Sequence, residues 1–306
     1  MRLVRTILMA ALLLGLPLGS WAAATAPAAE HAEKKEGIPL DPVQLGHLGP
    51  LPITNSMVVT WVVALGLIVA ARIATWNIQE VPSGFQNFWE WLVESLYDFL
   101  EGIIGADLVK KTFWFFATIF IFILFTNWFG LIPGVGTCGW GYKTKEGFDL
   151  VRPLLRGANA DLNMTLAMAM IFFVLWTIWA FQSNGALGFL NHIFGAKGET
   201  QGLMKVLMVV VFFLVGILEV VSILFRPVSL SFRLYGNTYA GENMLEAMGK
   251  VLPQAPWLIP IPFYFLEILV GLVQALVFML LTSVFTLLIC QHDEDHAHGK
   301  EHAHAH

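Results

Sequence analysis

One long apolar stretch decides the fold of this chain: residues 203–248, which read LMKVLMVVVFFLVGILEVVSILFRPVSLSFRLYGNTYAGENMLEAM. A helix of that length would run to about 70 Å, more than twice the thickness of the hydrocarbon core of a bilayer. It therefore cannot stand upright as a single membrane span. Two arrangements are open: a hairpin that turns near Arg226 and Pro227, or one steeply tilted helix that is kinked at Pro227.

The remaining apolar stretches also predict membrane-crossing helices. Residues 257–290 are again too long for one upright span, at about 50 Å if helical. Three shorter stretches are each long enough to cross once: residues 57–74, 113–132 and 162–181. Residues 83–105 place apolar and acidic side chains at helical spacing, which predicts an amphipathic helix in the membrane interface. We therefore predict an all-α integral membrane fold with about five crossing helices, the last two long and strongly tilted.

The composition excludes several classes of protein. The chain is 57% hydrophobic and 13% charged, whereas a soluble domain is about 45–50% apolar and about a quarter charged. The net charge of −5 leaves no basic surplus for nucleic acid. Cys138 and Cys290 lie far apart and predict neither a disulfide framework nor a thiol metal site. No phosphate-binding GxxxxGK[ST] loop occurs, so ATP chemistry is expected in partner chains.

The two ends of the chain differ from its middle. Residues 1–24 have the layout of a cleavable signal peptide, with an uncleaved first span as the alternative. Residues 25–52 then form a polar exported segment, 53–290 the membrane domain, and 134–160 a charged extramembrane loop within it. Five crossings from an outside N-terminus leave the His-rich tail, 291–306, in the cytoplasm. Its histidines lack the fixed spacing of a catalytic metal site, so we predict no metal.

Arg233 is the strongest candidate for a functional residue among the ionisable residues of this chain. Apolar sequence continues on both sides of it, and no acidic residue lies one helical turn away. Small or polar residues share its helix face: Ser229, Gly236, Asn237 and Ala240. Such a face lets another helix approach closely, and we expect that helix to bring a carboxylate to Arg233. The alternative is a structural arginine that reaches the lipid headgroups.

Two glutamates form a second group of candidates. Glu242 lies about half a turn out of phase with Arg233 and so points away from it. In the last apolar stretch, Glu267, Gly271 and Gln274 share one face. We expect Glu242 and Glu267 to face each other across a water-filled cleft, where two coupled carboxylates suit proton relay. The alternative is two solvated acids at helix ends.

Several motifs carry a family resemblance. The runs RPVSLSFRLYGNTYAGE (226–242) and VQALVFMLLT (273–282) resemble subunit a of the F-type ATP synthase membrane sector. VPSGFQNFWEWLVE, TNWFGLIPG and ADLNMTLAMAM resemble other landmarks of that family in the same order. The resemblance covers most of the chain, from about residue 51 to 290. One departure is notable, because the family often pairs a His with an acid where this chain has Glu242 and Glu267.

The resemblance implies a non-catalytic channel subunit without a cofactor, in a bacterial inner membrane. Its partners would be a rotating ring of c subunits, the b-subunit stalk, the rest of the ATP synthase complex and membrane lipid. Arg233 would be the essential arginine that faces the ring carboxylates between two aqueous half-channels. Asn237, Glu242, Glu267 and Gln274 match positions that line the half-channels or orient the arginine, and Ser229 matches one near the cytoplasmic path. The ion would be a proton or sodium.

Two other functions stay open on residues alone. A secondary cation transporter or an unrelated channel would account for charges at membrane depth, but transporters usually show internal repeats, and we find none. A membrane enzyme with a metal held by the terminal histidines would need fixed ligand spacing, which this tail lacks.

Overall fold

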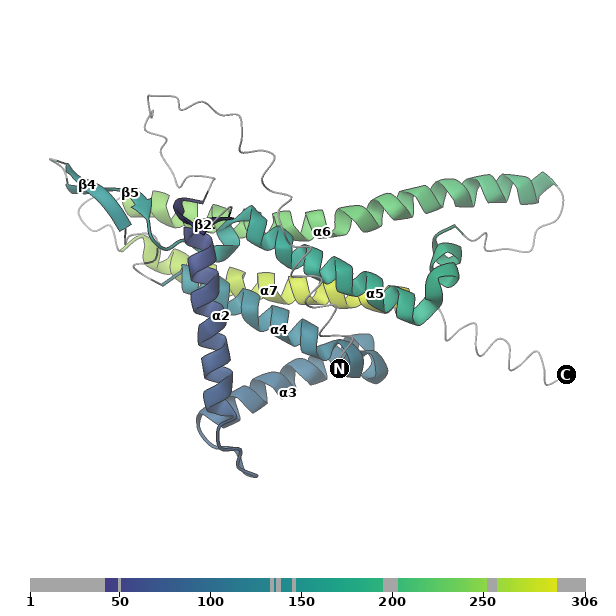
Figure 1. The fold of residues 1–306 in the computed structure, drawn as a ribbon, viewed down its shortest axis with the longest axis horizontal. Helices are drawn as coiled ribbons and strands as arrows, with labels where there is room; N and C mark the ends of the chain where they lie inside the picture. Colours follow the sequence, from purple (N-terminus) through teal and green to yellow (C-terminus); the bar gives the residue numbers. More distant parts are fainter. Residues whose placement is uncertain are drawn as a thin grey trace. The chain divides into compact units, whose positions relative to one another are not determined.

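The computed structural model describes most of the chain: residues 42–48, 51–132, 135, 139–144, 147–194, 203–251 and 258–290. Within these ranges the chain forms two short β-hairpins, one turn of 3-10 helix and a series of long α-helices (Figure 1). The segments interpreted as a signal peptide (1–24) and a His-rich tail (291–306) lie outside the described residues. Both interpretations stay predictions.

The helices confirm the membrane class of the fold. Five of them are long and apolar enough to cross a bilayer: α2 (Asn55–Ala74), α4 (Ala106–Gly130), the first part of α5 (Leu162–Phe194), α6 (Leu203–Val251) and α7 (Pro260–Cys290). Large apolar side chains cover their outer faces; Leu65 is 62% exposed, Ile68 66% and Leu218 69%. Water would not favour so much exposed apolar surface, so these faces suit lipid or a partner helix.

The longest helix decides between the two arrangements that the sequence left open. α6 runs without interruption from Leu203 to Val251, with Pro227 inside it. The hairpin near Arg226 and Pro227 is therefore wrong, and a single long helix is observed. At about 1.5 Å per residue, this helix exceeds the thickness of the hydrocarbon core, so it must tilt to stay within the membrane.

The amphipathic segment forms a helix of its own. α3 (Phe85–Ile104) has Leu96, Leu100 and Ile104 buried at four-residue steps. Its acidic side chains Glu94 and Asp98 are exposed. The helical spacing predicted from the sequence is therefore confirmed, with bounds within two residues of those expected.

Two boundaries differ from the sequence prediction for physical reasons. α4 begins at Ala106, ahead of the predicted apolar span at 113–132, because the polar residues before that span continue the same helix. α5 continues to Phe194, beyond the predicted end at 181, and changes direction at Gly185, where φ is +67°. Only glycine adopts that conformation readily, so Gly185 divides the membrane-crossing part of α5 from a second helical segment.

Two hairpins lie in segments for which the sequence predicted no structure. β1 (Gln44–Leu48) pairs antiparallel with β2 (Leu51–Thr54), just before α2. β4 (Gly139–Thr144) pairs antiparallel with β5 (Gly147–Pro153) within the charged loop at 134–160. The 3-10 turn η1 (Ala158–Ala160) follows and leads into α5. These strands are too short to give a strong alternating pattern, so hydropathy alone missed them.

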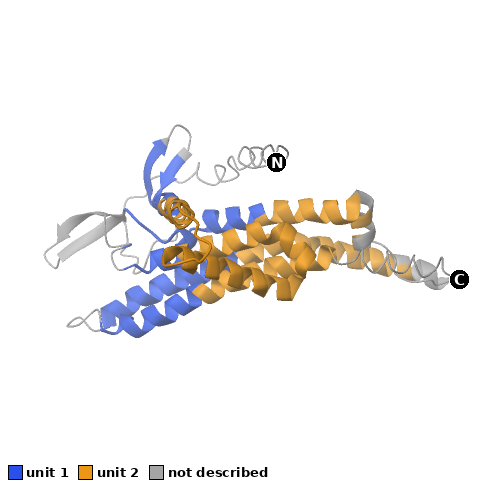
Figure 2. Ribbon diagram, turned by 90° about the horizontal axis from the view of Figure 1, so that it is seen from below, with its two compact units in different colours: residues 1–61, 126–171, 231–271 blue, residues 62–125, 172–230, 272–306 orange. Residues whose placement is uncertain are grey.

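The chain separates into two compact units (Figure 2). The unit made of residues 62–125, 172–230 and 272–306 has an aromatic core. Phe115 stacks on Phe172 with ring centroids 6.4 Å apart and meets Trp179 edge-on at 5.9 Å. Phe116 and Phe172 are almost fully buried. Dense aromatic packing contributes to the stability of this unit.

The unit made of residues 1–61, 126–171 and 231–271 is held together by buried polar contacts. Ser56 donates its hydroxyl hydrogen to Asp161, and both side chains are buried. The Oγ1 atom of Thr165 lies 3.0 Å from Oγ of Ser231, which joins α5 to α6. Hydrogen bonds between helices matter in a membrane, where apolar surface alone drives little association.

Asp161 provides a test of this polar packing. Its Oδ1 accepts the backbone N–H of Asn163 at 2.9 Å at the start of α5, while Oδ2 accepts the Ser56 hydroxyl. Asp161→Ala removes both contacts and should destabilise the protein by about 1–3 kcal/mol. Thermal unfolding of the purified protein should show a lower midpoint, and Asp161→Asn, which keeps an acceptor, should lose less. An unchanged midpoint for Asp161→Ala would contradict this role.

Candidate functional site

Arg233 lies on an exposed face of α6. Its neighbours on that face, Gly236, Asn237 and Ala240, are exposed as well. Within the described ranges, the guanidinium of Arg233 forms no hydrogen bond or ion pair. A Cβ atom at Gly236 would meet nothing within 4 Å, so this face is open to another helix. The expected small-residue face around one cation is therefore present.

Ser229 and Gln274 lie in the other compact unit. Ser229 is exposed on α6, and Gln274 on α7 is buried, with 5% of its surface accessible.

The structure brings Glu242 and Glu267 into one cluster. Glu267 is buried, and its carboxylate lies directly against the backbone of Gly241, next to Glu242. The charge of Glu267 acts on Glu242. The sequence predicts that these two acids face each other across a water-filled cleft; the cleft and the role of the acids in relay stay predictions.

Backbone surrounds the Glu242 carboxylate. Gly157 donates its N–H to this group, and a Cβ atom at Gly157 would overlap Oε1 of Glu242. A Cβ atom at Gly130 would lie 3.9 Å from the same oxygen and 3.3 Å from the Cα atom of Gly157. Residues 130 and 157 must be small because the chain approaches the carboxylate so closely.

A buried amide network lies in the same unit. Asn127, near the end of α4, donates from Nδ2 to the carbonyl oxygen of Gly271 on α7 at 3.1 Å. Its Oδ1 accepts Nδ2 of Asn159 at 2.7 Å and the hydroxyl of Thr238 on α6 at 3.4 Å. Trp128 adds a bond from Nε1 to the carbonyl of Ile268 at 3.2 Å. The network ties α4, α6 and α7 to the segment that carries Gly157.

Sequence reasoning named neither this network nor Arg156 as part of the site. Asn127 and Asn159 lie in or next to the TNWFGLIPG and ADLNMTLAMAM motifs, whose resemblance to the family assigns no role to either residue. The sequence places Arg156 in a charged extramembrane loop, yet the structure buries it, with 4% of its surface accessible. A basic residue three positions after a proline and followed by glycine carries no periodic signal that marks it as buried.

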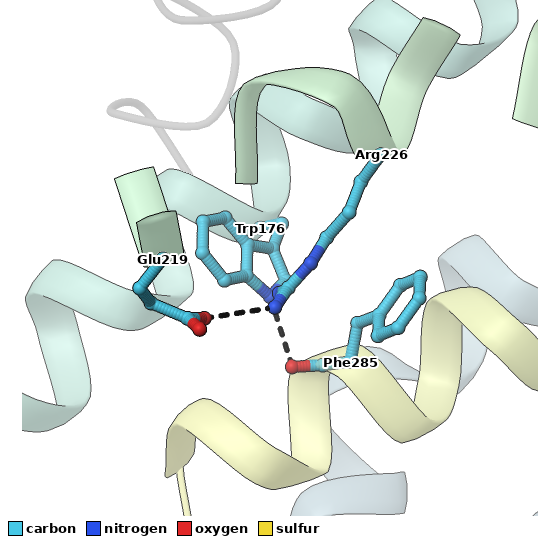
Figure 3. A network of polar contacts seen from close by, with 4 residues as sticks. All are labelled: Trp176, Glu219, Arg226 and Phe285. Carbon is cyan, nitrogen blue, oxygen red and sulfur yellow. Dashed lines mark hydrogen bonds and ion pairs between the residues drawn. The ribbon is translucent and has the colours of Figure 1, made fainter. Parts of the chain in front are cut away.

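Arg226 differs sharply from Arg233 although both lie on α6. Its Nη2 forms an ion pair with Oε1 of Glu219 at 3.0 Å. Its guanidinium lies over the rings of Phe285 and Trp176, at 4.6 and 5.6 Å from their centroids. The indole of Trp176 donates to the carbonyl oxygen of Phe285 at 3.0 Å (Figure 3). Arg226 is thus neutralised and covered within its own chain.

Metal chemistry finds no support in the described part of the chain. No group of three or more His, Cys, Asp or Glu side chains within the described ranges is arranged to hold a metal ion. The histidines of the C-terminal tail lie outside those ranges.

The fold and the site define a multi-pass helical membrane protein with an exposed arginine on α6, a half-buried acid on α6 and a buried acid on α7. The sequence model of the family described as ATP synthase A chain matches residues 57–286. The chain therefore belongs to the ATP synthase A chain family.

Individual relatives agree with this assignment. The chain is 32% identical to ATP synthase subunit a of Moorella thermoacetica over 244 residues, which cover 80% of this chain and 94% of the relative. It is 32% identical to ATP synthase subunit a of Gloeobacter violaceus, with 81% and 89% covered. It is 30% identical to a protein of Propionigenium modestum named ATP synthase subunit a, sodium ion specific, with 76% and 73% covered.

The contact between Gly241 and Glu267 yields a quantitative test. In a helix interior, Gly→Ala usually stabilises by about 0.5–1 kcal/mol. At Gly241 the new methyl group would collide with the Glu267 carboxylate, so Gly241→Ala should destabilise the purified protein instead. In a Glu267→Ala background the same change should become neutral or stabilising.

Gly66 on α2 serves as the matched control, because a Cβ atom there meets nothing within 4 Å. Gly66→Ala should not lower the unfolding midpoint in either background. Equal effects of Gly241→Ala with and without Glu267 would show that the two residues do not touch.

Proposed function

We propose that this chain is the ion-translocating stator subunit of a rotary F-type ATP synthase. The observation that carries the proposal is the exposed guanidinium of Arg233, which has no polar partner within the described ranges. An isolated charge at membrane depth costs about 2.5–3.5 kcal/mol on insertion scales, so it calls for a partner. A carboxylate on a passing helix of a c-subunit ring would supply that partner.

The chemistry of arginine suits this task. A guanidinium stays charged at any working pH, so it favours the charged form of an arriving carboxylate and makes that group release its ion. It also repels free cations, which prevents direct leakage from one side of the membrane to the other. Each unit charge moved across 100 mV yields about 2.3 kcal/mol, so several transfers are needed for each ATP. A rotating ring adds these transfers together.

The other polar residues would provide the two aqueous half-channels. We assign Glu242 and Glu267 to one of them as relay acids, with Asn237 and Gln274 lining the path or orienting Arg233. Ser229 belongs to the cytoplasmic path. The chain itself is non-catalytic in this proposal and works with the b-subunit stalk and the subunits that carry the nucleotide sites.

The proposal also includes a place and an orientation. The protein crosses a bacterial inner membrane with its N-terminus outside, after a signal peptide at 1–24, and its C-terminus in the cytoplasm. Its ion is a proton or sodium, because the ring carboxylate and its neighbours set that choice. Pumping by membrane vesicles with and without added sodium distinguishes the two.

Replacement of Arg233 tests the proposal. Arg233→Ala should abolish ATP-driven ion pumping in membrane vesicles, because nothing then forces the ring carboxylate to release its ion. Assembly of the complex should be largely retained. The matched control is Lys250→Ala, which removes one positive charge from the same helix at an exposed i,i+4 pair with Glu246 that contributes little. Pumping at the normal rate by Arg233→Ala would refute the proposal.

A further inference from the structure

A pocket of about 430 Å³ lies within the unit made of residues 62–125, 172–230 and 272–306. Its lining comes from the end of α3, the start of α4, the end of the membrane-crossing part of α5 and the end of α7. Pockets that hold small ligands measure about 300–1,000 Å³. None of the residues assigned to the ion path lines this pocket, so its purpose is a separate question.

The pocket lies at the boundary between polar and apolar surroundings. The amphipathic helix α3 ends at Ile104, and α4 begins two residues later. The apolar run of α4 starts at Phe113, directly after the lining residue Thr112. The crossing part of α5 ends at Gly185, and α7 ends at Cys290. Because crossing helices begin or end around this pocket, it lies at the level of lipid headgroups.

The lining offers charges of both signs. Asp107 and Lys111 lie one helical turn apart at the start of α4, and both are exposed. Within the described ranges neither of them forms an ion pair, although their spacing would allow one. Gln182 and Ser183, both exposed on α5, add polar groups to the same lining. A ligand with a negative and a positive group therefore finds a partner for each.

Apolar groups complete the surroundings. Trp179 and Leu287 contribute to the lining itself. Large apolar side chains next to lining positions are exposed on α4, α5 and α7: Trp114, Phe181 and Leu288. Tryptophan is enriched at the level of headgroups, where one part of its ring system is apolar and its N–H is polar. The pocket thus suits an amphiphilic ligand, with a charged group inside and apolar chains along the helices.

The order of the two charges narrows the choice of ligand. α4 runs from its start into the apolar run, so Lys111 lies about 6 Å deeper than Asp107 at about 1.5 Å per residue. In a phospholipid the phosphate is joined to the acyl-chain side, and an ammonium group lies farther out. Lys111 is therefore at the depth of the phosphate and Asp107 at the depth of the ammonium group. A headgroup with a phosphate alone would leave Asp107 without a cation.

We propose that this pocket binds the headgroup of a phospholipid that carries both a phosphate and a primary ammonium group. Lys111 pairs with the phosphate and Asp107 with the ammonium group, and the side chains of Gln182 and Ser183 donate hydrogen bonds to phosphate oxygens. The acyl chains follow the exposed apolar faces of the helices. This inference goes beyond the proposed function, because it concerns a bound lipid and not the transported ion.

Lipid binding by the purified full-length chain tests the inference. Native mass spectrometry in detergent measures the retained lipid, with phosphatidylethanolamine, phosphatidylcholine and phosphatidylglycerol of identical acyl chains as probes. Phosphatidylethanolamine should bind about three- to tenfold more tightly than the other two. Phosphatidylcholine lacks the ammonium N–H donors, and phosphatidylglycerol lacks the ammonium group. Equal affinity for all three lipids, or equal affinity for soluble phosphoethanolamine, would overturn the inference.

Single variants locate the site. Lys111→Ala should weaken phosphatidylethanolamine binding by about three- to tenfold. The matched control is Lys110→Ala, which removes an exposed positive charge one residue away that does not line the pocket, and binding should be unchanged. Asp107→Asn should abolish the preference for phosphatidylethanolamine over phosphatidylglycerol. Equal losses in Lys110→Ala and Lys111→Ala would show general attraction to lipid instead of a site.

An exchange of the two charges separates a lipid site from a simple pair on one helix. Asp107→Lys combined with Lys111→Asp keeps opposite charges one turn apart but reverses their order of depth. The preference for phosphatidylethanolamine should stay lost, and its recovery would contradict the assignment. The unfolding midpoint without lipid checks that each variant folds; Gln182→Ala, at an exposed lining position, should also weaken binding. Unchanged lipid binding in Lys111→Ala together with loss of a partner subunit from the complex would assign the pocket to a protein.

Discussion

The charge of Arg233, which has no polar partner within the described ranges, is the feature on which the proposed function depends. Two arginines on α6 show the contrast. Arg226 has a carboxylate at 3.0 Å and two aromatic rings over its guanidinium, which is the usual way to hold a cation away from water. Arg233 has no such partner within the described ranges and lies on a face of small residues. The structure therefore leaves this charge on an exposed face of α6, and the proposed function needs a partner carboxylate from another chain.

The two acids, Glu242 and Glu267, are packed closely against backbone. Glycines at 130, 157 and 241 bring backbone against the carboxylates of Glu242 and Glu267, and an amide network around Asn127 fixes the helices that carry them. Arg156, which precedes Gly157 in the chain, is buried as well.

Much of this architecture could be predicted from the sequence, because membrane spans depend on the length of apolar runs. That rule locates the five crossings, and the acids on α6 and α7 are then recognised as ionisable residues within apolar stretches. It cannot choose between a hairpin and a continuous α6, since Pro227 is compatible with both. It also missed short features that depend on tertiary contacts: the hairpins, the turn at Gly185 and the burial of Arg156. The segment 154–160 is charged and Gly-containing like a surface loop, yet it packs against Glu242.

Disulfide cross-linking within the assembled complex tests the central claim most directly. With Cys138 and Cys290 replaced, Gly236→Cys places a thiol on the Arg233 face of α6, where the structure leaves room for a side chain. We predict that it forms a disulfide with a cysteine introduced beside the ring carboxylate, whereas Leu65→Cys, exposed on α2, does not. Failure of Gly236→Cys to cross-link to any position on the ring would contradict the account.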